Sequence, residues 1–414
     1  MHILYLHQYF CPPGGAGNNR SYEFARTWVE AGHEVTLVCS TAYFPVDHPA
    51  CGVHRWCGDV EGIRVIAYNV AYRQEMSSFE RIKAFLKFFR YLLQEGFRGT
   101  KPDLVYASST PLTVGEAGRI VSKWRGIPLV FETVDVWPDV AFGMGYLRNR
   151  VLRGLLNGLT NRIYRRAKLV VCLSPGMRRQ VLQHTAVPGK VRVSLNGTNV
   201  SLFRPMREKR SEASGKVELI YAGAVGTANG VNQLIGAVKL LTAQPELPPF
   251  RLTVIGWGNQ LAAVQAMVQQ KALQEVVQFL PPLPKDQLAK FLPAFDIGVA
   301  TFAPYPVLEA NSANKFYDYC AAGLPVVLNY EGWQARHLRR YYAGLSAPQG
   351  DLLAFVRALR TLILDAEGRR QMGRNARLLA EAHYHRPALA SSLLEEMSWE
   401  IGAGVNEEQA ADNE

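Results

Sequence analysis

Short apolar runs alternate with longer amphipathic stretches along most of the chain, the pattern of parallel strands that are buried on both faces. Each run is rich in Val, Ile and Leu and is followed by a glycine, a proline or polar residues. The clearest runs are 2–6, 35–39, 103–108, 128–132 and 169–174 in the first half and 218–223, 250–256, 276–280, 296–300 and 326–328 in the second. Strands that alternate with helices in this way predict doubly wound α/β domains.

The alternation is interrupted once, near residues 201–216, where the chain is polar enough for a linker. We expect an N-terminal domain over 1–200 and a C-terminal domain over 216–382, both Rossmann-like and facing a central cleft. Residues 383–402 predict a final helix that packs back toward the N-terminal domain. The acidic tail 403–414 is expected to be disordered.

Each half opens with a glycine-rich turn between its first strand and the following helix. Gly15 and Gly17 lie in the first turn, and Gly223 and Gly226 lie in the second. Such turns expose backbone N–H groups to a phosphate or to a closely approaching substrate, although a merely flexible loop has the same composition. The glycine spacing of the first turn is not the dinucleotide fingerprint, which disfavours a nicotinamide cofactor.

A loop, a helix and a buried strand follow one another from Asn311 and carry the strongest candidate chemistry. Asn311 or Ser312 is placed to cap the helix, and Phe316 begins its buried face. Lys315 lies in the first turn, where N–H groups and the helix dipole already favour an anion. Asp318 is its neighbour on the helix surface, and a carboxylate is a good acceptor for a ribose diol. A nucleoside diphosphate would satisfy both groups, whereas a surface helix with an incidental Lys–Asp pair is the alternative.

Three carboxylates, Glu132, Asp135 and Asp139, follow the apolar run at 128–132. The carboxyl ends of strands are where open α/β sheets bind their ligands. We expect Asp135 to reach a bound sugar, whereas Glu132 is equally suited to hydrogen-bonding the loop.

The net charge of +11 is unevenly distributed. Residues 1–200 carry 25 Lys and Arg against 14 Asp and Glu, whereas residues 201–414 carry 21 of each. The first half is therefore expected to face an anionic partner, such as a phosphorylated lipid or an acidic membrane surface. No nucleic acid is expected as a partner, because no recognised nucleic-acid-binding motif accompanies the charge.

Residues 80–98 predict an amphipathic helix in which cations are interleaved with aromatic residues, and residues 147–168 predict a second basic helix. The first has the composition of an interfacial helix, although a domain helix with snorkelling lysines has the same pattern. Its predicted apolar face contains Ile82, Phe85, Phe89 and Leu92. The predicted membrane or acceptor face comprises Lys83, Phe85, Lys87, Phe89 and Arg90.

Several classes of protein are disfavoured by composition. No run of about 18 apolar residues suggests a membrane span. The chain enters a strand at once without a signal-peptide pattern, and its six cysteines follow no zinc spacing. We expect a cytoplasmic protein with reduced thiols, no metal site and no bound cofactor.

Over nearly its whole length the chain resembles family 4 glycosyltransferases of the GT-B fold, and within them the subgroup that builds bacterial O-antigen and capsule repeat units, typified by fucosamine transferases. The motifs are specific when taken together. They are Tyr5–Phe10, Gly14-Gly15, Arg20–Arg26, Gly32–Thr36, Asp135 with Trp137-Pro138, Asn196-Gly197, Tyr221–Gly223 and Asn314–Gly323.

The resemblance implies transfer of a sugar from a nucleotide donor with retention of anomeric configuration and without a metal ion. The donor implied is a UDP-sugar, with an N-acetylated hexosamine or another hexose as the sugar. The acceptor implied is a polyprenyl-diphosphate-linked sugar or a glycan, and the protein is expected to associate peripherally with the inner face of the cytoplasmic membrane.

Residue roles also follow from the resemblance. Asp135, Lys315 and Glu309 are the implied catalytic residues; the first acid of the family's Glu-x7-Glu motif falls on Ala310, so the adjacent Glu309 is the candidate for its role. The implied nucleotide-sugar-binding residues are Gly15, Gly17, Asn196, Gly223, Gly226, Leu283, Asn314, Lys315, Phe316 and Asp318. The second glycine-rich turn lacks the cations that many relatives carry, so we expect Lys315 to supply most of the positive charge. A nucleotide-sugar 2-epimerase of the same fold and a catalytically degenerate binding subunit are the alternatives.

Overall fold

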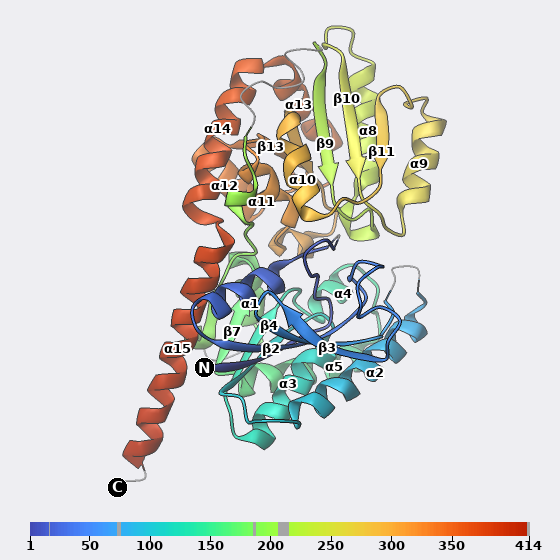
Figure 1. The fold of residues 1–414 in the computed structure, drawn as a ribbon. Helices are drawn as coiled ribbons and strands as arrows, with labels where there is room; N and C mark the ends of the chain where they lie inside the picture. Colours follow the sequence, from blue (N-terminus) through green and yellow to red (C-terminus); the bar gives the residue numbers. More distant parts are fainter. Residues whose placement is uncertain (16, 73–75, 185–187, 206–214, 412–414) are drawn as a thin grey trace. The chain divides into compact units, whose positions relative to one another are not determined.

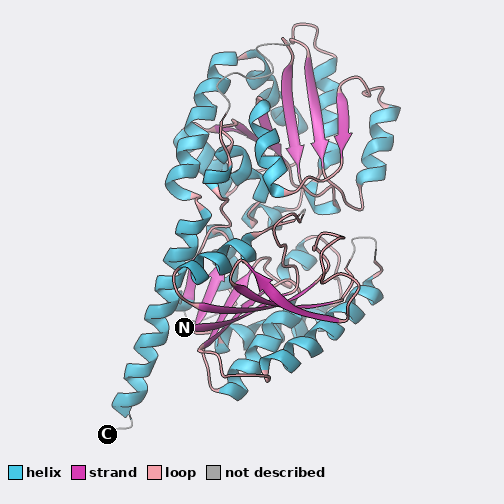
Figure 2. Cartoon of the chain, viewed as in Figure 1, coloured by secondary structure: helices cyan, strands magenta, loops and turns pink. Residues whose placement is uncertain are grey.

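The computed structural model describes residues 1–15, 17–72, 76–184, 188–205 and 215–411, with side chains as far as residue 402. The chain divides into two compact units: unit 1 contains Met1–Leu195 and Arg386–Glu414, and unit 2 contains Asn196–His385. Each unit is a largely parallel sheet flanked by helices (Figures 1 and 2). The prediction of two Rossmann-like α/β domains is confirmed, and the cleft expected between them stays a prediction.

The sheet of unit 1 has the strand order β3-β4-β2-β1-β5-β6-β7-β8. Its neighbouring strands are parallel except β3 and β4, which form an antiparallel hairpin at one edge. The strands are β1 (His2–His7), β2 (Glu34–Ser40), β3 (Arg55–Val60), β4 (Ile63–Tyr68), β5 (Leu104–Ser108), β6 (Leu129–Thr133), β7 (Leu169–Cys172) and β8 (Val191–Val193). From β1 the chain first adds β2, β3 and β4 on one side of the sheet and then crosses to add β5 to β8 on the other side. This reversal creates a topological switch point at the carboxyl ends of β1 and β5.

Helices cover both faces of this sheet. On one face, α1 (Arg20–Glu30) packs against α15 (Arg386–Ala411), and the indole Nε1 of Trp28 donates to the Ala390 carbonyl at 3.0 Å. On the other face, α3 (Leu112–Arg125) packs against both α2 (Ser78–Gly96) and α5 (Arg150–Arg166) (Figure 1). Two shorter helices, α4 (Asp139–Gly143) and α6 (Pro175–Leu182), complete the unit.

The C-terminal helix differs from the sequence expectation at both ends. Helix α15 begins at Arg386 rather than at residue 383, and it continues to Ala411 instead of giving way to a disordered tail at 403. Glu, Gln and Ala residues near this end are good helix formers, which is why the acidic composition does not end the helix. Residues 412–414 lie outside the described residues. The first segment of unit 1 ends at Leu195 rather than at residue 200, and unit 2 covers Asn196–His385 rather than 216–382. Residues 206–214 of the expected linker lie outside the described residues.

The sheet of unit 2 is parallel throughout, in the order β11-β10-β9-β12-β13-β14. The strands are β9 (Val217–Ala222), β10 (Phe250–Ile255), β11 (Val277–Leu280), β12 (Ile297–Ala300), β13 (Val326–Leu328) and β14 (Gly344–Ser346). The helices are α8 (Val231–Thr242), α9 (Leu261–Gln270), α10 (Lys285–Phe291), α11 (Asn314–Ala321), α12 (Trp333–Tyr341), α13 (Leu352–Leu364) and α14 (Ala366–His383). Every residue of β9, β12 and β13 is buried, as continuous apolar runs predict for strands covered on both faces.

Candidate functional site

The candidate residues of unit 2 gather at the carboxyl edge of its sheet, where β9 runs into Gly223 and α11 begins. Tyr319 fixes α11 to this edge: its hydroxyl accepts a hydrogen bond from the Ala222 N–H at 2.7 Å and donates to the Val299 carbonyl at 3.3 Å. The first turn of α11 is thereby held against β9 and β12, at the place where open α/β sheets bind ligands.

The start of α11 differs from the sequence expectation. Its N-cap residue is Ala313, and no side chain caps the helix. Neither of the expected caps, Asn311 or Ser312, therefore caps the helix, and the Ser312 hydroxyl oxygen lies 2.6 Å from the Tyr317 hydroxyl. A helix N-terminus without a side-chain cap presents N–H groups to an anion, so the correction strengthens the expected anion site.

Lys315 is buried in this first turn, with only 8% of its surface exposed. Its ammonium nitrogen lies 4.7 Å from the centre of the Tyr221 ring. Within the described part of the chain it makes no hydrogen bond or salt bridge. Burial lowers the pKa of Lys315 to about 8, although the nearby Asp318 carboxylate acts in the opposite direction. A buried cation without a direct counter-ion is costly, which favours a site completed by an anion.

Two further polar groups near α11 lack partners among the described residues. The side-chain oxygen of Asn314 is buried without a hydrogen-bond partner. Glu309, in the short 3-10 helix Pro306–Ala310, is half-buried, and no hydrogen bond or ion pair is found for its carboxylate in the described chain. Asn314, Lys315 and Glu309 are thus unsatisfied groups that a polar ligand would complement.

Asp318 is buried, but its carboxylate already has two partners. Thr198 donates its hydroxyl hydrogen to Oδ1 at 2.8 Å, and the Lys285 ammonium lies 2.5 Å from both Oδ1 and Oδ2. Lys285, the first residue of α10, was not predicted to contribute to the site. It lies two residues after Leu283, one of the implied nucleotide-sugar-binding residues, and that proximity in sequence was the available signal.

The second glycine-rich turn allows Lys315 to reach its position. A Cβ atom on Gly223 would lie 2.8 Å from Cε of Lys315, and the φ angle of Gly223 is 153°. Any other residue here would push the lysine away from the edge of the sheet. The turn then continues through Gly226, whose N–H donates to Oδ1 of Asn229 at 3.2 Å.

The remaining residues predicted in unit 2 have different environments. Leu283 is half-buried in the turn between β11 and α10, and Asn196 is buried at the first residue of the unit. Phe316 is completely buried, with its ring packed against those of Tyr317, Trp333 and Tyr384. Its ring therefore belongs to the core, and only its backbone remains available to a ligand.

In unit 1 the first glycine-rich turn is tightly packed. A Cβ atom on Gly15 would lie 2.6 Å from Sγ of Cys11 and 2.8 Å from the Tyr43 carbonyl oxygen. One on Gly17 would lie 3.1 Å from Cys11 as well. Packing against the 40–44 loop alone therefore requires glycine at residue 15, whether or not a substrate also approaches it.

Asp135 lies just beyond the end of β6, at the carboxyl edge of the unit 1 sheet. The Thr110 hydroxyl donates to its Oδ2 at 3.4 Å. Burial raises the pKa of Asp135, and the hydrogen bond from Thr110 offsets only part of that effect. A carboxyl group with a raised pKa at a ligand-binding edge is suited to accept or share a proton.

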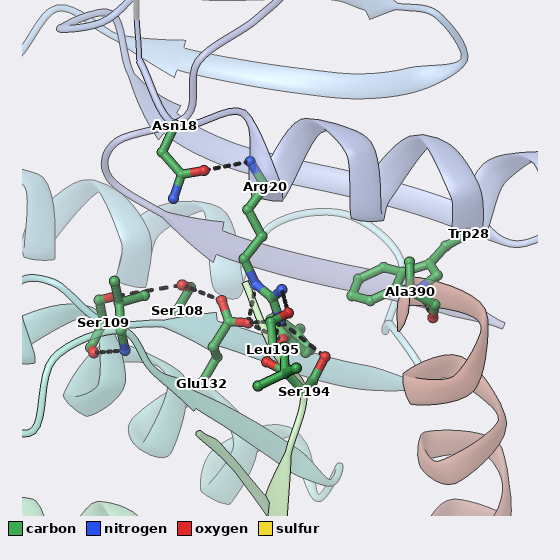
Figure 3. A network of polar contacts seen from close by, with 11 residues as sticks. Asn18, Arg20, Trp28, Ser108, Ser109, Glu132, Ser194, Leu195 and Ala390 are labelled. Carbon is green, nitrogen blue, oxygen red and sulfur yellow. Dashed lines mark hydrogen bonds and ion pairs between the residues drawn. The ribbon is translucent and has the colours of Figure 1, made fainter. Parts of the chain in front are cut away.

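Glu132, the other candidate carboxylate on β6, belongs to the interior instead. It is 1% exposed and forms a salt bridge with Arg20 at 2.8 Å, as Figure 3 shows. Tyr106 and Ser108 donate to it at 2.9 and 2.7 Å. Burial alone would raise its pKa, but Arg20 and these hydrogen bonds outweigh burial and lower it.

Arg20 also holds the end of the unit 1 chain before it enters unit 2. Its guanidinium donates to the Leu195 carbonyl at 2.6 Å and to the Ser194 hydroxyl at 3.2 Å (Figure 3). In the sequence Arg20 is marked only by its place in the motif Arg20–Arg26. Its partner is distant in sequence, so no local pattern predicts the contact.

Helix α2 has the predicted mixture of apolar and basic residues but a different orientation. Ala84, Phe88 and Leu92 are buried against the unit. Phe85 and Phe89 are only half-buried, so they are not the exposed aromatic residues of the expected membrane face. The exposed side chains that line a hollow of about 630 Å³ are Phe79, Ile82, Lys83, Leu86, Lys87 and Arg90.

Neither a metal-binding cluster nor a membrane-spanning helix is found among the described residues. No group of three or more His, Cys, Asp or Glu side chains in this part of the chain is arranged to hold a metal ion. No described helix combines the length and apolar character needed to cross a membrane.

Comparisons with known proteins agree on the two-domain architecture. Residues 15–197 match the glycosyl transferase 4-like domain, and residues 203–379 match the glycosyl transferases group 1 domain. Glycogen synthase of Mycobacterium tuberculosis (strain CDC 1551 / Oshkosh) is 21% identical over 381 residues, which cover 88% of this chain and 86% of that protein.

Two solved structures have a similar fold. Sucrose-phosphate synthase from Thermosynechococcus elongatus has a TM-score of 0.77 at 16% identity, covering 97% of this chain and 99% of that chain. Anabaena Alr3699/HepE, solved in complex with UDP-glucose, has a TM-score of 0.70 at 17% identity, covering 96% of this chain and 99% of that chain. At these identities the solved structures show the shared fold alone.

Proposed function

We propose that this chain, which belongs to the GT-B glycosyltransferases, is a retaining, metal-independent enzyme that takes a sugar from a nucleotide donor and builds bacterial cell-surface polysaccharide. The donor is a UDP-sugar, with an N-acetylated hexosamine or another hexose as the transferred sugar. The acceptor is a polyprenyl-diphosphate-linked sugar at the inner face of the cytoplasmic membrane. The subgroup that builds O-antigen and capsule repeat units is the one the motifs resemble.

The observation that carries the proposal is the buried ammonium of Lys315 at the uncapped start of α11. A diphosphate bound there would supply the counter-ion that the described residues do not provide. The lysine and the backbone N–H groups would stabilise the negative charge that develops on the leaving UDP, the largest contribution that such a site makes to catalysis. Removal of one preorganised donor of this kind costs about 3–4 kcal/mol of transition-state stabilisation.

The other groups at the edge of the unit 2 sheet take the rest of the donor. Asp318 accepts from the ribose hydroxyls: an ionised carboxylate has about four acceptor positions, and Thr198 and Lys285 engage three of them. Glu309 and the Asn314 amide contact the sugar or the diphosphate. The resemblance implies that Asp135 acts on the donor sugar, and the acceptor hydroxyl attacks from the face that the diphosphate leaves.

A UDP donor is supported by the fold shared with Anabaena Alr3699/HepE, which binds UDP-glucose. A lipid-linked acceptor is supported by the excess positive charge of residues 1–200 and by the exposed apolar and basic side chains of α2. Metal independence is supported by Lys315, since a lysine at the diphosphate takes the place of a divalent cation.

Nucleotide release from UDP-, GDP- and dTDP-sugars, with and without membrane extract, tests the proposal. We expect release that depends on the extract, survives EDTA, and adds one hexose or hexosamine mass to a lipid diphosphate. NMR of the product should show the anomeric configuration of the donor.

Two outcomes would contradict the transferase. A changed sugar nucleotide that forms without any acceptor would identify a 2-epimerase. Donor binding without turnover in extract that supports a known lipid glycosyltransferase would identify a binding subunit.

A further inference from the structure

The first turns of α5 lie at the surface of unit 1, where the guanidinium carbon of Arg153 lies 5.1 Å from the centre of the Phe142 ring. Residues 150–155 are all exposed, and the buried residues of this helix, Thr160, Ile163 and Tyr164, lie in its second half. Val151 and Leu155 are 73% and 68% exposed. A helix that is set by a cap but leaves its apolar side chains in water marks a surface that binds something.

The helix start is nevertheless well defined. Oδ1 of Asn149 accepts from the N–H groups of Val151 and Leu152 at 2.9 and 3.1 Å, so the exposed turns begin with a strong N-cap. Just before this cap, Tyr146 is 61% exposed. The segment from Tyr146 to Leu155 is therefore a short, ordered element that presents apolar side chains to solvent.

The charged residues within this segment are all positive. Arg148, Arg150 and Arg153 are exposed within it. The sequence has no acidic residue between Asp139 and Glu208. Asp139 lines a hollow together with Arg153, and its carboxylate lies 2.7 Å from Nε2 of His184. An occupant of this surface must therefore combine apolar groups with negative charge.

The segment lies at the same edge of unit 1 as the candidate site. Helices α2 and α5 follow β4 and β6, two strands that run parallel in the sheet, so both helices begin at its carboxyl edge. Asp135 lies at the same edge. The exposed apolar side chains of α2, which are Phe79, Ile82 and Leu86, also lie in the first half of their helix.

Helix α3 contacts both α2 and α5, the helices that carry the two groups of exposed side chains. The two groups thus lie on one helical layer and at one edge of it. Cations are interleaved with apolar groups in both. An anionic membrane surface is flat and can contact the exposed side chains of α2 and of α5 at the same time. A bound peptide helix, in contrast, would need one continuous groove.

We propose that residues 146–155 form a second membrane contact, which acts with the first half of α2 to seat the carboxyl edge of unit 1 on an anionic bilayer. The proposal rests on the function proposed above, because a lipid-linked acceptor has its reacting sugar at the bilayer surface. Seating this edge on the bilayer brings the acceptor close to the edge that holds Asp135. The apolar side chains enter the headgroup region, and the arginines meet the anionic lipids.

Vesicle sedimentation with the full chain tests this surface without donor or acceptor. Vesicles of phosphatidylcholine are compared with vesicles that also contain phosphatidylglycerol. The double variant Val151→Ser/Leu155→Ser is expected to bind the anionic vesicles at least about tenfold more weakly, which corresponds to ~1.4 kcal/mol. The variant Arg150→Gln/Arg153→Gln is expected to lose most of the preference for phosphatidylglycerol, since each cation near such a surface contributes roughly fivefold.

Trp124 provides a matched control. It is 78% exposed but lies at the C-terminal end of α3, the opposite end of the same helical layer. Trp124→Ser should therefore bind vesicles like the wild type. Thermal unfolding of each variant checks that the fold is kept, and because Val151 and Leu155 are largely exposed, the transition should not move.

Three results would overturn the proposal. The first is unchanged vesicle binding by the Val151→Ser/Leu155→Ser variant. The second is an equal loss for Trp124→Ser, which would mean that any exposed apolar residue contributes. The third is a change in sedimentation coefficient without a change in vesicle binding, which would identify a protein–protein surface. Donor turnover in detergent is measured separately, so failure of the membrane contact is distinguished from failure of the glycosyltransferase function.

Discussion

The ammonium nitrogen of Lys285 lies 2.5 Å from each carboxylate oxygen of Asp318, and both side chains are largely buried. The pair joins the start of α10 to the first turns of α11, two helices that flank the predicted donor site. A buried pair of this kind contributes mainly by holding geometry, because the loss of solvation offsets much of the attraction between the charges.

Replacement of Lys285 tests this pair. Lys285→Met is expected to lower the free energy of unfolding by ~3 kcal/mol, because it leaves the Asp318 carboxylate buried without its counter-ion. The double variant Lys285→Met/Asp318→Asn should recover much of that loss. Urea unfolding measures both, and Lys290→Met, an exposed position on the same helix, is the control. A loss in Lys285→Met no larger than in the control would show that the pair is not a structural contact.

Lys315 is expected to affect catalysis and stability in opposite directions. Lys315→Met should reduce nucleotide release by about 10²–10³-fold, because the leaving diphosphate loses its cation. The same variant should unfold at an equal or higher temperature, since it removes a buried charge that has no direct partner. Steady-state turnover and thermal unfolding of the same samples provide the two measurements. Near-normal turnover would remove Lys315 from the mechanism.

The pH dependence of stability gives an independent check on Lys315. Its pKa is lowered to about 8 in the folded protein, against about 10.4 for an unfolded chain. Between these values the unfolded state binds more protons, so this group makes the folded state more stable as the pH rises from about 8 to 10.4. The free energy of unfolding of the wild type, relative to that of Lys315→Met, should therefore rise by roughly 3 kcal/mol over this range, as measured by urea unfolding. A constant difference between the two proteins would show that the lysine is not desolvated.

Donor affinity should change with pH in the opposite direction. A diphosphate binds the charged lysine, so UDP binding by the free enzyme is expected to weaken as the pH rises above about 8. Isothermal titration calorimetry with UDP from pH 7 to pH 10 measures this directly. In Lys315→Met the dependence should be absent or much smaller, and an identical dependence in both proteins would assign it to another group.

Helix α1 carries one arginine in a buried ion pair, Arg20 with Glu132, and another in exposed ion pairs, Arg26. Arg20→Met is expected to lower the free energy of unfolding by about 3–5 kcal/mol, because Glu132 stays buried and the Ser194–Leu195 backbone loses its donor. Arg26 on α1 pairs with Glu30 and Glu61 at the surface. Arg26→Met should cost less than about 1 kcal/mol. Equal effects of the two substitutions in urea unfolding would contradict the assignment of Glu132 to the core.

The sequence by itself determined the features that depend only on residues close to one another along the chain. Apolar runs located the strands, glycine-rich turns located the start of each half, and the spacing of Lys315 and Asp318 placed both in the first turns of one helix. These signals are local, because burial on both faces of a strand and the 3.6-residue period of a helix leave a pattern in adjacent residues. The two α/β domains followed from the order of these elements alone.

Only the tertiary structure decided which distant groups meet. Lys285 reaches Asp318 across 33 residues and Arg20 reaches Glu132 across 112, and no local pattern encodes either contact. The orientation of α2 was decided in the same way. Its apolar residues occupy most of its circumference, so packing against the unit chose Ala84 and Phe88 for the interior and left Ile82 and Leu86 exposed. A sequence records that a residue is apolar, but which side of a helix is covered depends on the elements that fold against it.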